Sequence, residues 1–151
     1  MTAKVFLNEQ IKKLADYYDV TLIVNLSSKE YLLKEISQVA RIINIPIKRE
    51  IALLNDIKAL ILLIVFFNRE KFTIVHSVSP KAGLLTMISS WVVRVPVRIH
   101  TFTGQVWVTR KGLIRYLLCF LDKVIYKLST KIIIDSKSQL NFLKKNNIIP
   151  K

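Results

Sequence analysis

Polar and aromatic side chains gather in the stretch RIHTFTGQVW, which runs from Arg98 to Trp107 and holds one of the chain's two histidines and one of its two tryptophans. His100 could serve as a general base or hydrogen-bond donor, because the pKa of histidine lies near neutrality. Gly104 allows a sharp turn or a close ligand approach, and Thr103 and Gln105 flank it with a hydroxyl and an amide. The pattern predicts a ligand-binding loop at a strand end. An ordinary strand-turn junction is the alternative.

A second candidate is the stretch VHSVSPKAG, in which His76 lies near a predicted strand end and Ser79 to Gly83 open a helix. The free backbone N–H groups and the dipole of a helix N-terminus favour an anion, and Lys81 adds a positive charge. The alternative is a plain strand-to-helix turn with a good cap. Neither glycine-rich nucleotide motif, G-x-G-x-x-G or G-x-x-x-x-G-K-[ST], occurs in the sequence.

Other chemistries find little support in the residue types. Two histidines and one cysteine stand far apart, so we expect neither a metal site nor a cofactor. A Ser-His-Asp hydrolase would need a G-x-S-x-G turn, and none occurs. The net charge is +14, and the segment from Pro96 to Lys151 has eleven Lys/Arg and two Asp/Glu, a net +9. This basic field favours anionic lipid or phosphorylated substrates. No nucleic-acid partner is expected, because no nucleic-acid motif is present.

A helix predicted from about Gly112 to Ser129 bears a basic stripe. Its cations stand at multiples of four residues: Lys111, Arg115, Lys123 and Lys127. Its predicted apolar side consists of Leu117, Leu118, Leu121, Val124, Ile125 and Leu128. The stripe is either a solvated face over a packed core or a face lying near anionic lipid headgroups.

A cytoplasmic location is expected, because no signal peptide is visible. The longest apolar run, Ala59 to Phe67, has nine residues, whereas about 20 are needed to span a bilayer. We interpret the run as a buried helix.

Helical and strand periodicity alternate along the chain. Helices are predicted at about 3–18, 51–70, from Ser79 and Pro80 onward, at 112–129, and after Ser136 or Ser138 as a cap. Strands are predicted at 20–26, 42–47, 72–78, 97–102 and 131–136, with a loop at 103–111. The segment 27–40 fits either a short helix or an ordered loop. This alternation predicts an α/β fold, a single three-layer domain with a doubly wound, Rossmann-like parallel sheet.

The segments HSVSPKAGLL, RVPVRIHTFTGQ and DSKSQLNFL occur in this order, and together they resemble the N-terminal domain of family 4 glycosyltransferases of the GT-B fold. The bacterial members that build surface polysaccharides are the most similar. TAKVFLNEQIKKL and YDVTLIVNL resemble the first helix and second strand of that domain. The resemblance covers nearly the whole chain, residues 1–151, and implies a partial domain without the usual first strand or the C-terminal donor-binding domain.

The resemblance implies a hexosyl- or other glycosyltransferase that moves a sugar from a nucleotide-sugar donor to a saccharide acceptor, often a lipid-linked one at the membrane. The N-terminal domain would hold the acceptor, at the inner face of the plasma membrane. Because the donor half is absent, the chain alone is expected to be inactive. Many relatives have a histidine where this chain has Thr103. Either Thr103 and Gln105 make the contacts that this histidine makes in the relatives, or the role of the histidine does not apply to this chain.

The alternative is a Rossmann-like binding module without chemistry, which associates with an anionic membrane or with a partner subunit. We expect salt-sensitive binding to anionic vesicles from such a module.

Overall fold

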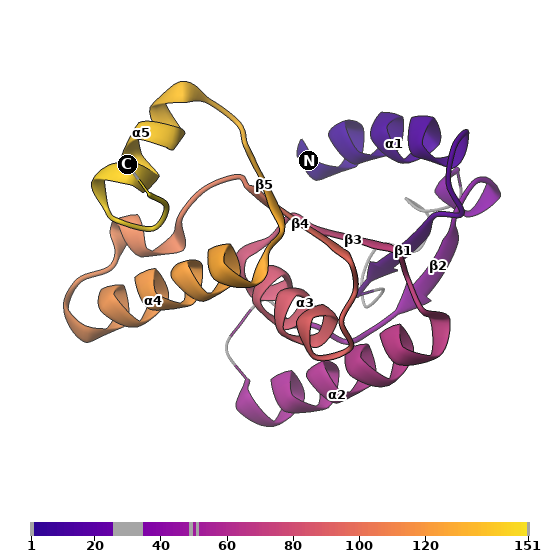
Figure 1. Ribbon diagram of the computed structural model, residues 1–151, viewed down its shortest axis with the longest axis horizontal. Helices are drawn as coiled ribbons and strands as arrows, with labels where there is room; N and C mark the ends of the chain where they lie inside the picture. Colours follow the sequence, from indigo (N-terminus) through magenta and orange to yellow (C-terminus); the bar gives the residue numbers. More distant parts are fainter. Residues whose placement is uncertain (1, 26–34, 49, 51, 151) are drawn as a thin grey trace. The chain divides into compact units, whose positions relative to one another are not determined.

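A computed structural model describes residues 2–25, 35–48, 50 and 52–150 of the chain, with side chains from residue 9 onward (Figure 1). The chain divides into two compact units, Met1–Asn55 and Asp56–Lys151. All strands that the structure describes pair in parallel, and helices separate them in sequence. The predicted α/β class with parallel strands is confirmed.

The first unit contains helix α1 (Thr2–Ala15), strand β1 (Thr21–Val24), a short 3₁₀ helix (Ile36–Gln38) and strand β2 (Arg41–Asn44). Strands β1 and β2 pair in register from Thr21 with Arg41 to Val24 with Asn44. Ile11, Ile36 and Ala40 form its small core. The ambiguous segment 27–40 lies mostly outside the described residues, and its end forms the 3₁₀ helix.

The second unit holds strands β3 (Ile74–Ser77), β4 (Val97–Phe102) and β5 (Lys131–Ile134) in the order β3-β4-β5. Its helices are α2 (Leu53–Glu70, which begins just before the unit boundary), α3 (Pro80–Val92), α4 (Gly112–Leu128) and α5 (Lys137–Lys145). The predicted loop at 103–111 contains a 3₁₀ helix, Val106–Thr109. Figure 1 shows α3 and α4 as neighbours, and the two helices contact each other.

The described strands form two parallel sets, β1-β2 in the first unit and β3-β4-β5 in the second. Each set has the parallel pairing that the predicted Rossmann-like fold requires.

The core of the second unit gathers side chains from β4, α3, α4, α5 and the segments next to them. Its buried members are Met87, Phe102, Trp107, Ile125, Leu143, Ile148 and Ile149. This cluster fixes the loop after β4 against α5, because Trp107 belongs to the loop and Phe142 of α5 packs on the same cluster. Among the described helices, none combines the length and apolar character that crossing a bilayer requires.

Candidate functional site

An open groove lies beyond the carboxyl ends of β4 and β5. It has a volume of about 550 Å³ and is lined by Thr103, Gly104, Gln105, Val108, Asp135, Ser136, Ser138, Gln139 and Phe142. The two strands are parallel neighbours, so the segments that follow them meet at one edge of the sheet. That edge is where open α/β sheets bind ligands. The structure thus places the predicted residues Thr103, Gly104 and Gln105 together in one concave surface.

The walls of the groove are rich in hydroxyl and amide groups. Ser136 caps α5, and its Oγ accepts a hydrogen bond from the backbone N–H of Gln139 at 3.2 Å. The hydroxyls of Ser136 and Ser138 lie 2.9 Å apart. The amide nitrogen of Gln105 is buried and has no hydrogen-bond partner within the described part of the chain. Because an unpaired buried donor is costly, this nitrogen favours a polar acceptor beside it.

An aromatic floor supports this edge of the groove. The Phe142 ring, which lines the groove, stacks on Trp107 with a centroid distance of 5.3 Å and an interplanar angle of 18°. Trp107 is fully buried, and its Nε1–H donates to Asp122 Oδ2 at 2.7 Å. Burial raises the pKa of Asp122 to about 6, although the hydrogen bond from Trp107 opposes the shift. This contact anchors the loop after β4 to α4.

His100 lies away from the groove, in the interior of the second unit. Its Nδ1 is 2.8 Å from Ser77 Oγ, and its ring meets Phe102 edge-on at a centroid distance of 4.6 Å. Burial, and then the neighbouring His76, lower the pKa of His100 to about 4. A neutral ring is therefore held between strands and helix α3, an arrangement that fits a structural role.

Gly83 and His76 surround this buried histidine. A Cβ atom at Gly83 would lie 2.5 Å from His100 Cε1, so the absence of a side chain there lets the ring pack against α3. His76 faces the other side of the sheet, where its Nε2 lies 2.7 Å from Thr101 Oγ1. His100 and Phe102 therefore lie on one side of β4, and Thr101 lies on the other.

The start of α3 contains the other predicted anion-binding residues. Ser79 is the N-cap residue and Pro80 follows it, as predicted, but the Ser79 side chain makes no cap hydrogen bond. Lys81 Nζ lies 2.7 Å from Asp56 Oδ1, and both side chains are largely buried. The positive charge expected at this helix terminus is thus paired with a carboxylate.

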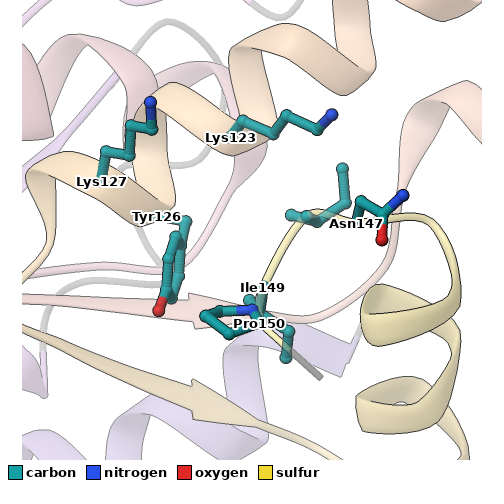
Figure 2. Close-up of a pocket in the computed structure, with 7 residues that line it drawn as sticks. Lys123, Tyr126, Lys127, Asn147, Ile149 and Pro150 are labelled. Atoms are coloured by element: carbon teal, nitrogen blue, oxygen red, sulfur yellow. The ribbon is translucent and has the colours of Figure 1, made fainter.

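The predicted basic stripe on α4 divides into two parts. Arg115 lies over the Trp107 ring, with its guanidinium carbon 5.6 Å from the centroid, and Lys111 is the N-cap residue of the helix. Lys123 and Lys127 line a separate hollow of about 260 Å³ with Tyr126 and the C-terminal turn (Figure 2). Residues four apart on a helix drift by about 40° per step, so a run at this spacing does not share one face.

The predicted apolar side of α4 needs one correction. Ile125 is buried as expected, but Leu117 is 55% exposed. The helix carries apolar residues around most of its circumference. The core takes the side that includes Leu118 and Ile125, because that side faces α3 and the aromatic cluster. Leu117 falls outside it.

Sequence reasoning did not single out the α5 side of the groove. Asp135 and Ser136 end the predicted strand 131–136, and Ser138 and Gln139 come just after it. The predicted strand could have indicated these residues. The carboxyl ends of neighbouring parallel strands meet at one edge of the sheet, so the residues after β5 lie near those after β4.

The groove is suited to a neutral polyhydroxyl ligand. Its hydroxyls and amides match sugar hydroxyls, and Phe142 offers an apolar surface. Asp135 is the one carboxylate among its lining residues. No cluster of three or more metal-ligating side chains occurs within the described residues.

No protein-family model matches the chain. It is 40% identical over 94 residues to the capsular polysaccharide biosynthesis glycosyltransferase CapM of Staphylococcus aureus, covering 62% of this chain and 25% of that protein. It is 33% identical over 86 residues to the UDP-Gal:alpha-D-GlcNAc-diphosphoundecaprenol alpha-1,3-galactosyltransferase of Escherichia coli, covering 56% of this chain and 22% of that protein. The matches thus span about a quarter of the length of these relatives. Over more than half of its length, the chain is similar to glycosyltransferases, which supports a glycosyltransferase role.

Proposed function

We propose that the chain is the acceptor-side, N-terminal part of a family 4 glycosyltransferase of the GT-B fold, acting in surface polysaccharide synthesis. The observation that carries the proposal is the groove, in which Thr103, Gly104 and Gln105 meet the start of α5. The similarity to two glycosyltransferases supports it.

The proposed acceptor is a saccharide linked to a lipid through a diphosphate, and the proposed donor is a nucleotide sugar. Both classes appear in the name of the E. coli relative. The unpaired amide nitrogen of Gln105 and the Ser138 hydroxyl would bind acceptor hydroxyls, with Phe142 beneath the sugar. The donor would bind mainly to a C-terminal domain like that of the family. The 151-residue chain alone would then not transfer sugar. The enzyme would work at the inner face of the plasma membrane.

Acceptor binding can be measured on the chain itself by calorimetric titration with a water-soluble GlcNAc-diphosphate analogue carrying a short polyprenyl tail. The variants Gln105→Ala and Ser138→Ala should each weaken binding about 5- to 10-fold, because each removes a hydrogen bond worth about 1 kcal/mol. Thr73→Ala, an exposed position next to the amino end of β3, is the control and should leave affinity unchanged. Unchanged affinity in both groove variants would refute the assignment of the groove.

Incubation of the chain with UDP-sugars and the same analogue tests its activity directly. No glycosylated product should be detected by mass spectrometry. Turnover by these 151 residues would contradict the proposed division of labour between two domains.

The second candidate is a binding module without chemistry, and the exposed apolar side chains on α4 favour it. The two candidate functions predict different saccharide binding in the groove. A module that binds membranes only would show no affinity for the saccharide analogue, whereas the glycosyltransferase part would bind it.

A further inference from the structure

One buried side chain holds the segment that forms the lip of the groove, defined as Gln105 and Val108. Among residues 103–111, all of which the structure describes, Trp107 is the only buried one, with 1% of its surface exposed. Gln105 caps the 3₁₀ helix Val106–Thr109, and the backbone N–H of Val108 donates to its carbonyl oxygen at 3.3 Å. A single turn of this kind has little stability of its own. The position of the lip therefore depends on how Trp107 is held.

Trp107 is held by contacts from two helices. From α4, Asp122 Oδ2 accepts a 2.7 Å hydrogen bond from the indole Nε1–H, and the guanidinium carbon of Arg115 lies 5.6 Å from the ring centroid. From α5, the Phe142 ring stacks on the indole at a centroid distance of 5.3 Å. Phe142 also forms the floor of the groove. The indole thus links the lip of the groove to its floor.

The acceptor in this contact is an unusual residue for its surroundings. Asp122 is 6% exposed, on a side of α4 that otherwise brings Leu118 and Ile125 to the apolar core. Burying a carboxylate is unfavourable unless it accepts hydrogen bonds. The bond from Trp107 is charge-assisted when the carboxylate is ionised, which makes it about twice as strong as a neutral one. Because a hydrogen bond is directional, it fixes the orientation of the indole, which apolar packing alone does not.

We propose that Asp122 positions the groove through Trp107: the hydrogen bond between them keeps the lip and the floor in the arrangement that binds the ligand. Neither residue lines the groove. When the bond is lost, the lip takes up other positions, and the apparent affinity falls with the fraction of molecules that keep the binding arrangement. The proposal rests on the proposed function for the identity of the ligand, a saccharide, but not for the link between Asp122 and the lip.

Calorimetric titration of the full chain with the GlcNAc-diphosphate analogue measures the effect on binding. Asp122→Leu removes the acceptor and leaves the indole N–H unpaired, so the dissociation constant at about pH 7.5 should rise about tenfold or more. Asp122→Asn keeps an acceptor oxygen without the charge, so its binding should be only about threefold weaker than that of the wild type. The matched control is Arg98→Met, because Arg98 lies near the amino end of β4 and the groove lies beyond the carboxyl end. It should bind like the wild type.

The pH dependence separates positioning from packing. Burial raises the pKa of Asp122 to about 6, and no charged group of α3, α5 or the loop contributes to the shift within the described residues. The wild type should therefore bind about threefold more tightly than Asp122→Asn at about pH 7.5 and equally at about pH 5, where the carboxyl is neutral. Arg115, Cys119 and Lys123 are the ionisable neighbours on α4. Both proteins keep these groups, so the ratio of their dissociation constants reports on Asp122.

A measurement without ligand distinguishes this proposal from the proposed function. Trp91→Phe leaves Trp107 as the only tryptophan, and acrylamide quenching of its fluorescence reports how firmly the indole is held. Asp122→Leu in this background should raise the quenching constant severalfold, whereas Arg98→Met should leave it unchanged. If the wild-type chain does not bind the analogue, the proposed function fails, and the quenching alone decides the positioning role. Circular dichroism of every variant checks that the fold is kept.

Four results would overturn the proposal. Wild-type binding that Asp122→Leu leaves unchanged would show that the groove does not depend on this contact. Equal losses of affinity in Asp122→Leu and Arg98→Met would mean a general loss of stability. A ratio between the wild type and Asp122→Asn that stays constant with pH would exclude a role for the charge of Asp122. Equal quenching with and without Asp122→Leu would mean that Trp107 is held without the carboxylate.

Discussion

The contact between Gly83 and His100 yields a quantitative prediction. In Gly83→Ala, the new methyl group would lie 2.5 Å from His100 Cε1 and 2.8 Å from Nδ1, whereas ordinary contacts begin near 3.4 Å. The ring cannot easily retreat, because it is 1% exposed and held by Ser77 and Phe102. Overpacking of this kind costs about 1–3 kcal/mol, and the better helix propensity of alanine returns up to about 1 kcal/mol. We expect a net loss of about 1–2 kcal/mol.

Urea unfolding followed by far-ultraviolet circular dichroism measures this loss as a lower midpoint with an unchanged slope. Gly104→Ala is the control, because a Cβ atom there meets nothing within 4 Å. Its free energy of unfolding should stay within about 0.5 kcal/mol of the wild type.

A double-mutant cycle shows whether the ring is the cause. In the His100→Ala background the ring is gone, so Gly83→Ala should no longer destabilise the protein. The same loss in both backgrounds would refute the steric explanation.

Three further predictions concern stability. Burial raises the pKa of Asp122 to about 6 and lowers that of His100 to about 4, so acidification from about pH 7 to 4 gains stability from Asp122 and loses it from His100. Asp122→Asn removes this gain, so its free energy of unfolding should fall by about 2 kcal/mol more than that of the wild type between about pH 7 and pH 4, as measured by urea titration. Parallel pH profiles of the two proteins would contradict this prediction. Ser136→Ala should cost about 1 kcal/mol and Ser138→Ala less than half of that, because Ser136 caps α5; equal losses in melting experiments would exclude the cap. Arg98→Met should cost about 2 kcal/mol, because Arg98 donates to two backbone carbonyls at 2.7 Å, and Arg98→Lys should recover only part; full recovery would show that the fork geometry is unimportant.

Local sequence signals determined the order and type of the elements. The strand predicted at 97–102 coincides with β4, and the helix predicted from Gly112 begins there. Ser136 was one of two predicted caps, and its hydroxyl makes the cap bond. These features depend on residues within a few positions of one another, where periodicity and capping preferences act directly.

The candidate groove was half predictable. Thr103, Gly104 and Gln105 follow a strand with an unusual composition, which drew attention to them. The α5 side required knowing that β4 and β5 are neighbours. Strand order depends on contacts between residues about 30 positions apart, which no local pattern contains.

The sequence alone thus determined the alternation of helices and parallel strands, the basic charge and the loop after β4. Only the tertiary structure decided which apolar residues entered the core. On α4, the side with Leu118 and Ile125 packs inward while Leu117 and Phe120 remain exposed. It also decided that His100 is a neutral interior residue, because the glycine at position 83 and the hydroxyl of Ser77 enclose its ring. Packing selects one of several apolar faces according to the elements that meet it, and those elements are distant in sequence.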